Sequence, residues 1–253
     1  MTVKKRSYFA WVVVVLLLIG TVGVWYYRSD SFLLRALVTL PNQADKLASL
    51  PETDLSSGSL SIFAHHPVIA AEPALYPVAK TLVTHAYLDI NESEKQSLLQ
   101  KQAAATALQA LAAGEIDLAL ISEPHPEDLA KASAKSQVHL QLLAKDAVVF
   151  LAPQRQTLSN LTISQAVAKM SSNRWQAYQW LDENERQTYR LLSVANIYPS
   201  WESIQSDNYP LIVNIYAAYT KADNIYVQQV RDFFLSVQGQ KLLSDYKFVS
   251  INR

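Results

Sequence analysis

Residues 97–124 read SLLQKQAAATALQALAAGEIDLALISEP. The Ala- and Leu-rich run from Ser97 to Ala113 favours a helix, and Gly114 suits its C-terminal cap because glycine tolerates a left-handed backbone. Ile116–Ile121 then predicts a short buried strand, which Pro124 ends. A helix that leads directly into a buried strand indicates an α/β fold.

The pattern continues on both sides of this stretch. Apolar residues recur at helical spacing from Leu75 to Ala86, with Pro77 in the first turn. The further elements that we expect are strands at 60–64, 138–142, 147–151, 211–219 and 248–251, and helices at 127–134, after Thr162 and at 227–237. Strands that alternate with helices predict an α/β domain with a mainly parallel sheet.

Composition excludes several classes of protein. The chain has 253 residues, half of them apolar and 17% charged, so it is long enough to bury a core and is not a disordered polymer. The net charge of zero gives no basic excess for nucleic acid, and without cysteine there is no thiolate metal site or cysteine nucleophile. Glycine-rich phosphate loops and a GxSxG nucleophile motif are also missing. We therefore expect no enzyme, no catalytic residues and no cofactor.

The N-terminus predicts a membrane anchor. Tyr8–Tyr27 holds twenty uncharged residues, and a helix of this length spans about 30 Å, the thickness of the bilayer's hydrocarbon. The basic residues within 1–7 should remain cytoplasmic, which places the rest of the chain outside the cell membrane. A cleaved signal peptide is the alternative, although bulky residues stand where a cleavage site would need small ones. Residues 28–59 then form a juxtamembrane helix and a polar linker before a domain at 60–253.

Several stretches together resemble the phosphate-binding proteins of phosphate ABC importers. They are PVIAAEPALYP at 67–77, GEIDLALISEP at 114–124, LLAKDAVVFLAP at 142–153, YPLIVNIY at 209–216 and FFLSVQGQKLLSDYKFVSI at 233–251. The resemblance implies a periplasmic-binding-protein-like (type II) fold of two lobes with a ligand in the cleft between them. Lobe one would comprise about 60–145 and 215–253, and a reduced lobe two about 146–214.

The same resemblance singles out four cleft positions: Glu72, Thr106, Ser122 and Glu123. The family's first motif is Asp-Gly-Ser-Thr, and Ala70–Pro73 stands in its place. Ala71 replaces the glycine that lets backbone approach an oxyanion, Glu72 puts a carboxylate where a hydroxyl should donate, and Pro73 has no N–H. The family also carries an Arg followed by a Ser-Gly-Ser run in lobe two, and this chain has no such run between Trp175 and Tyr189.

Simpler interpretations stand beside these assignments. Glu72 can complement the dipole of the helix that follows it, and Ser122–Glu123 can form a turn. His65 and His66 are neighbours that would face opposite sides of a strand, so we expect no metal site there.

The sequence thus favours a membrane-anchored extracytoplasmic relative of the phosphate-binding proteins whose phosphate site is lost and which serves as an accessory or interaction module, with a membrane transporter as one candidate partner. The alternative is a functional solute-binding protein or sensor for phosphate or another small ligand.

Overall fold

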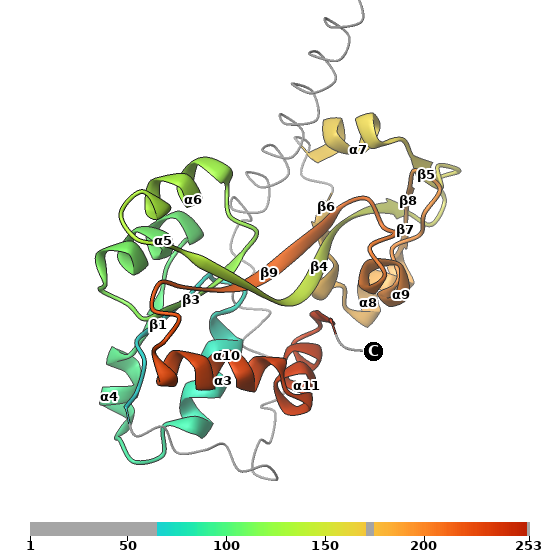
Figure 1. The fold of residues 1–253 in the computed structure, drawn as a ribbon. Coiled ribbons are helices and arrows are strands. Elements are labelled where there is room, and N and C mark those ends of the chain that lie inside the picture. Colours follow the sequence, from blue (N-terminus) through green and yellow to red (C-terminus); the bar gives the residue numbers. More distant parts are fainter. Residues whose placement is uncertain (1–64, 171–174, 252–253) are drawn as a thin grey trace, which may run out of the picture.

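A computed structural model describes residues 65–170 and 175–251 of the chain (Figure 1). The expected anchor at 8–27, the linker and the expected strand at 60–64 lie outside these residues. Within the described ranges no helix is both long and apolar enough to cross a bilayer.

The elements up to the first long strand are β1 (Ile69–Ala71), α3 (Tyr76–Ala86), α4 (Glu92–Ser97), β2 (Leu99–Lys101), α5 (Ala104–Ala113), β3 (Leu118–Ser122) and α6 (Pro126–Ser133). The middle of the chain forms β4 (His139–Pro153), β5 (Asn160–Leu161), α7 (Ile163–Met170), β6 (Trp175–Ala177), the 3₁₀ turn η1 (Tyr178–Trp180), α8 (Glu183–Thr188), β7 (Tyr189–Leu191), β8 (Ser193–Val194) and α9 (Trp201–Gln205). The last part contains β9 (Ile212–Tyr219), α10 (Ile225–Leu235), α11 (Val237–Asp245) and β10 (Val249–Ser250).

The main sheet contains both parallel and antiparallel strand pairs, so the prediction of a mainly parallel sheet is wrong. Its strand order is β10-β4-β9-β3-β1-β2, and β6 and β7 also pair with β4. Among its strands in residues 65–170 and 175–251, only the pairs β1–β2 and β1–β3 are parallel. The long return strand β9 enters between β3 and β4 and runs antiparallel to both, which local periodicity does not reveal.

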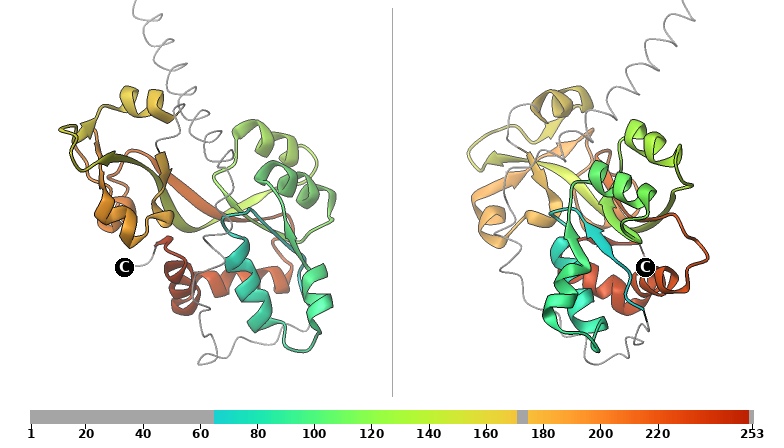
Figure 2. Two further views of the ribbon diagram at one scale, coloured as in Figure 1. Left: turned by 180° about the vertical axis from the view of Figure 1, so that it is seen from behind. Right: turned by 90° about the vertical axis from the view of Figure 1, so that its left-hand side faces the viewer.

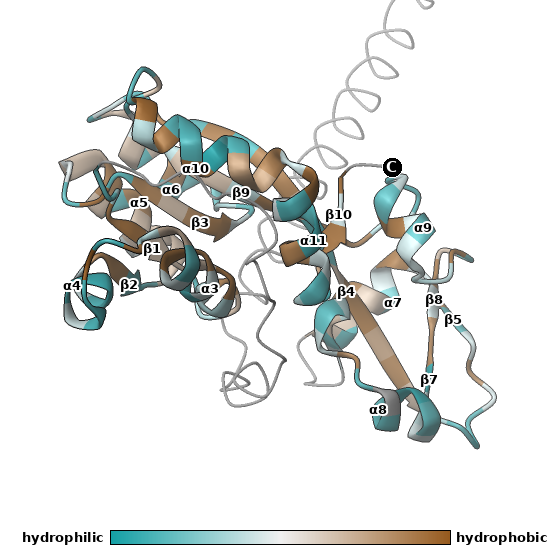
Figure 3. Cartoon of the chain, turned by 90° about the horizontal axis from the view of Figure 1, so that it is seen from below, coloured by the Kyte–Doolittle hydropathy of each residue, from teal (hydrophilic) through white to brown (hydrophobic). Residues whose placement is uncertain are grey.

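Strands β4 and β9 extend through both halves of the molecule (Figures 1 and 2). The expected strands at 138–142 and 147–151 are one continuous strand, β4, with an irregular register between Leu142 and Ala144. Around one half of the pair lie two hydrophobic clusters: the large core, built from 69–144 and 215–248, and a smaller cluster, built from 70–132 and Ala218. Around the other half lies a second core, built from 147–213 and Val249. Figure 3 shows that these strands are largely hydrophobic, whereas the helices alternate hydrophobic and hydrophilic residues.

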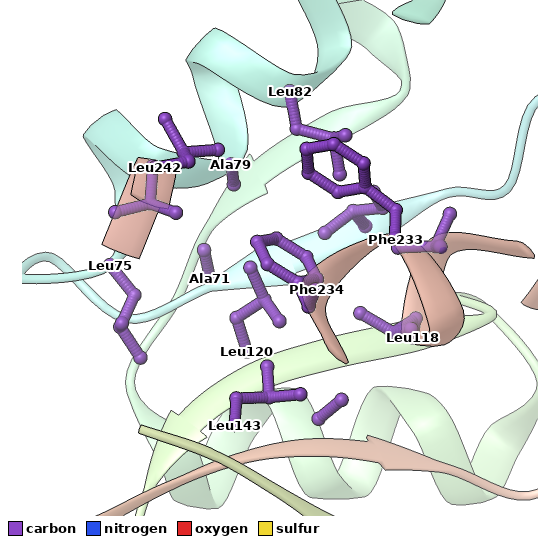
Figure 4. Close-up of a cluster of buried hydrophobic side chains, with 14 of the residues drawn as sticks. Ala71, Leu75, Ala79, Leu82, Leu118, Leu120, Leu143, Phe233, Phe234 and Leu242 are labelled. Atoms are coloured by element: carbon purple, nitrogen blue, oxygen red, sulfur yellow. The ribbon is translucent and has the colours of Figure 1, made fainter. Parts of the chain in front are cut away.

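The large core packs helices α3, α10 and α11 against β1 and β3. Phe234 is fully buried, and Figure 4 shows it in the middle of this cluster, close to Leu120 of β3. Burial of each such side chain contributes roughly 1.5–3 kcal/mol. The C-terminal segment is therefore an integral part of this core.

The expected helix at 97–113 is correct only in its second half. Asn91 starts α4 with a capping box, and Leu99–Lys101 then pairs with β1 as an extended strand before α5 begins. Pairing with a strand thirty residues earlier overrides the helix propensity of this run. Gly114 has the expected left-handed backbone at the end of α5 (φ 76°).

The expected helix at 227–237 is also divided. It ends at Leu235, and Ser236 caps a new helix, α11, by accepting a hydrogen bond from the N–H of Gly239. Val237 is 85% exposed at the start of α11 and does not pack on the sheet.

Candidate binding site between the two cores

Glu72 follows β1 directly, and its side chain is buried, with 8% exposed. Its Oε2 accepts a hydrogen bond from the backbone N–H of Ser122 at 2.9 Å. The side chain of Ser122 and the backbone amide of Ala104, the first residue of α5, also interact favourably with this carboxylate. Burial raises the pKa of Glu72, and these hydrogen bonds act in the opposite direction.

The carboxylate of Glu72 thus interacts with the N-terminus of α5 and the end of β3. Helix α3, which follows Glu72 in sequence, starts without a side-chain cap and has no acidic residue in its first turn. Complementing the dipole of α3 is therefore not the main contact of Glu72. Its hydrogen bond with the N–H of Ser122 instead joins two residues that are fifty positions apart in the sequence.

The four predicted cleft residues do not all meet. Glu72 and Ser122 lie together and line one small cavity. Glu123 points its Oε2 toward Asn214, which donates a hydrogen bond of 3.1 Å, and it does not line the cavity. Thr106 is exposed on α5 and does not line it either.

Sequence reasoning missed Asp146, a second buried carboxylate on the same cavity. It lies in the middle of β4, is 4% exposed, and its Oδ1 accepts hydrogen bonds from the N–H groups of Ala147 (2.8 Å) and Gln179 (3.2 Å). Burial raises the pKa of Asp146 to about 7. The signal was visible as the charged pair Lys145–Asp146 between two apolar stretches, residues 142–144 and 147–152.

The cavity lies where the two cores meet. Its volume is about 40 Å³, and its polar lining consists of Glu72, Ser122, Asp146 and Gln179. Its other walls are apolar, among them Leu75 and Ile215 of the large core and Val213 of the second core. Since a buried water needs about 10–15 Å³, this space holds about three waters or one small ion.

The ionisable side chains that line the cavity, Glu72 and Asp146, are both acidic. Within residues 65–170 and 175–251, neither Glu72 nor Asp146 forms an ion pair with a basic side chain. The neighbouring Lys145 is bound elsewhere, to Asp207 at 2.7 Å. The same ranges hold no cluster of three or more His, Cys, Asp or Glu residues that could bind a metal. Two carboxylates without a cation make this site unfavourable for an anion.

Comparison with known proteins gives matches in structure alone. No protein-family model and no curated sequence matches the chain. An ABC-type phosphate transport receptor from Vibrio cholerae superposes with a TM-score of 0.54 at 13% identity, over 72% of this chain and 98% of the receptor. A possible phosphate-binding protein from Planctomyces limnophilus gives 0.52 at 12% identity, over 73% and 93% of the two chains. A putative phosphate ABC transporter substrate-binding protein from Clostridium perfringens, solved with bound phosphate, gives 0.51 at 9% identity, over 73% and 98%. The chain therefore has the fold of phosphate-binding proteins, as its sequence motifs indicate.

Proposed function

We propose that this chain is a membrane-anchored, extracytoplasmic protein with the binding-protein fold whose phosphate site is lost. In this proposal it has no catalytic activity and serves as an accessory or interaction module, with a membrane transporter as its partner. The large core and the second core correspond to lobe one (about 60–145 and 215–253) and a reduced lobe two (about 146–214). The span at 8–27 holds the domain at the membrane.

The observation that carries the loss of phosphate binding is the position of the Glu72 carboxylate. An anion at a helix N-terminus is held by free backbone N–H groups and by the helix dipole. Here the amides of Ser122 and Ala104 already donate to Glu72. A phosphate would have to displace a covalently attached carboxylate and then remain beside it, and like charges in a buried site are expensive.

The sequence around Glu72 supports the same conclusion. Ala71 has a side chain where close approach of backbone to an oxyanion requires glycine, and Pro73 has no N–H to offer. In the other half of the site, no Arg followed by a Ser-Gly-Ser run stands between Trp175 and Tyr189. Neither side of the cavity then supplies the donors that a doubly charged anion needs.

A membrane transporter is proposed as partner on two grounds. Structural neighbours of this chain are described as parts of phosphate ABC transport systems. The uncharged run at 8–27 would also hold the domain close to membrane proteins.

A small-ligand receptor is the second candidate function, and the cavity itself favours it. The space between the cores has a partly polar lining, formed by Glu72, Ser122, Asp146 and Gln179, of the kind that orients a small ligand.

Calorimetric titration of the full chain, purified in mild detergent, tests the loss of phosphate binding. We expect no binding of phosphate or sulfate tighter than millimolar. A micromolar dissociation constant for phosphate would overturn the proposal and favour the receptor for phosphate. The variant Glu115→Gln, which removes one exposed acid on the same half of the molecule, is the control for the effect of net charge.

A further inference from the structure

The outer end of the second core carries a group of exposed apolar side chains. Seven large apolar side chains are exposed among residues 65–170 and 175–251, and four of them belong to the segments around the two-stranded sheet of β5 and β8. These four are Leu158 (38% exposed), Ile163 (40%), Tyr189 (39%) and Tyr198 (53%). Single exposed apolar residues are ordinary, whereas a group of them at one end of a molecule indicates a contact surface.

Hydrogen bonds join these segments into one unit, residues 153–170 and 189–200, which we call the tip. Strands β5 and β8 pair in parallel, and α7 packs beside β5. The guanidinium of Arg190 donates to the carbonyls of Gln156 and Leu158, which ties the loop before β5 to β7. Figure 1 shows α7, β5, β7 and β8 together at the end of the molecule away from α4 and α10. The exposed apolar side chains therefore share one end of the fold.

The charged residues of the tip are all basic. It contains Arg155, Lys169 and Arg190 and neither aspartate nor glutamate, although the net charge of the whole chain is zero. Arg155 is exposed, and the carbonyl partners of Arg190 leave its positive charge in place. Two of the acids that precede the tip, Asp182 and Glu185, are engaged at the start of α8, where each accepts a hydrogen bond from the backbone N–H of the other. The tip thus combines exposed apolar groups with a local positive charge.

We propose that the tip binds the surface of a bilayer that contains anionic phospholipids. Basic side chains complement the phosphates of such a surface. Tyrosine rings favour the interface between water and hydrocarbon, and leucine and isoleucine side chains favour the boundary of the acyl chains. The inference rests on the proposed membrane anchorage, which keeps the domain beside a bilayer, and goes beyond it by assigning the part of the domain that contacts lipid.

The length of chain before the domain permits this contact. Residues 28–64 separate the uncharged run at 8–27 from the first described residue. At about 3.3–3.6 Å per residue their greatest reach is roughly 120–130 Å, so the tip can lie on the bilayer that holds the anchor. Because the anchor makes this contact intramolecular, a weak affinity of the tip for lipid is sufficient.

The form of the surface favours lipid over a protein partner. The cavity between the cores is lined by no residue of the tip. A protein partner commonly fills a shaped pocket with a buried anchor residue, whereas a lipid surface adapts to separate side chains.

Fluorescence of a label on the tip tests the contact in the full chain, reconstituted in vesicles of phosphatidylcholine with or without phosphatidylglycerol. Thr157→Cys places a single thiol between Arg155 and Leu158 at an exposed position of a chain that has no cysteine. In vesicles with phosphatidylglycerol, the emission of a polarity-sensitive dye there should shift to the blue and be quenched by spin-labelled lipid. High salt should reverse both effects, because it screens the attraction between exposed charges. The same dye on Glu115→Cys, exposed on the large core's half, should remain in water throughout.

Matched variants in the Thr157→Cys background make the test specific. Arg155→Gln should lower the equilibrium constant between lipid-bound and free tip about fivefold, the effect of one basic residue at an anionic surface. Lys135→Gln removes an exposed cation from the other half of the molecule and should leave this constant unchanged. Leu158→Ser should lower it severalfold, whereas Leu88→Ser, at a residue 65% exposed near α3, should not.

Three results would refute the lipid contact. The first is a tip label that remains in water with both lipid compositions, which would leave the tip as a surface for a protein partner. The second is an equal response with and without phosphatidylglycerol, and the third is a response that Arg155→Gln and Leu158→Ser both retain in full.

Flotation with vesicles of phosphatidylcholine alone reads the anchor separately. A chain that does not float with them refutes the proposed anchorage, while the label still reports contact of the tip with vesicles that contain phosphatidylglycerol. A chain that floats but whose tip label stays in water supports the anchorage and refutes the lipid contact.

Discussion

The role of the Glu72 carboxylate can be inferred only from the sequence and the structure together. The sequence identifies it as an anomaly, because an acid stands where the resembling motif has a hydroxyl. It could not show that this acid reaches the N–H of Ser122 and the start of α5, since that contact depends on the pairing of β1 with β3. The carboxylate is best understood as an internal ligand that uses the donors of an anion site.

This interpretation predicts chemical rescue. Glu72→Ala should destabilise the chain by about 1–3 kcal/mol, because the amides of Ser122 and Ala104 lose their acceptor in a buried place. Formate, which is a free carboxylate of the right kind, should restore part of that stability in a concentration-dependent manner, while phosphate should restore little. Urea unfolding with and without formate measures both effects. Parent chain and Glu115→Ala should show no response to formate, and an unresponsive Glu72→Ala would contradict the internal-ligand interpretation.

Asp146 should make the stability of the chain depend on pH. Its pKa is raised from 3.8 to about 7, so between these values the native state holds a proton that the unfolded chain has lost. The native state binds more protons there, and the free energy of unfolding falls as pH rises through this window and levels off above it. Glu72 acts in the same direction.

Asp146→Asn should therefore lose a large part of this pH dependence, up to roughly 4 kcal/mol across the window, because the asparagine is uncharged at every pH. Urea unfolding of both proteins from about pH 4.5 to about pH 8 gives the two curves. Parallel curves would show that Asp146 does not titrate in this range.

At the scale of elements, the sequence predicts what short-range patterns determine. Helices α3 and α6 and the cap at Gly114 follow from spacing, proline and glycine within a few residues. The wrong predictions have a common physical cause, which is pairing with strands that are distant in the sequence. Residues 99–101 are extended because β1 lies beside them, and β4 is continuous because β9 pairs along most of its length. The mixed sheet and the position of Asp146 opposite Glu72 were invisible for the same reason.

The junction of α10 and α11 permits a sharp test at this scale. A Cβ on Gly239 would lie 2.0 Å from the carbonyl oxygen of Phe233 and 2.5 Å from the Cα of Phe234. These are backbone atoms, which cannot move aside as the end of a flexible side chain can. Gly239→Ala should therefore lower the free energy of unfolding by at least about 3 kcal/mol. Gln238→Ala, at an exposed neighbouring position, should stay within about 0.5 kcal/mol of the parent. Thermal or urea unfolding compares them, and equal stabilities would mean that the two helices do not pack this closely.

For the molecule as a whole, the proposed orientation is cytoplasmic N-terminus and extracytoplasmic domain. Because the chain has no cysteine, single cysteines report on topology without background. Glu115→Cys, at an exposed position of the domain, should react with a membrane-impermeant maleimide on intact cells or, where an outer membrane is present, on spheroplasts. Thr2→Cys should react only after lysis. The reverse pattern, or a Glu115→Cys protein that is released from the membrane as a soluble chain, would refute the anchored topology.

The large core is closed by residues from the far end of the chain, so the molecule should not tolerate their removal. Phe233, Phe234, Leu242, Leu243 and Phe248 are all buried there against segments more than a hundred residues earlier. Each contributes roughly 1.5–3 kcal/mol, against a total stability of about 5–15 kcal/mol for an ordinary domain. Deletion of residues 233–253 should therefore abolish the cooperative unfolding transition. Two point variants separate core packing from chain length: Phe234→Ala should cost about 3–5 kcal/mol, whereas Val237→Ala, at a position 85% exposed, should cost less than about 0.5 kcal/mol. A truncated chain that still melts cooperatively near the parent's Tm would show that lobe one folds without its C-terminal helices.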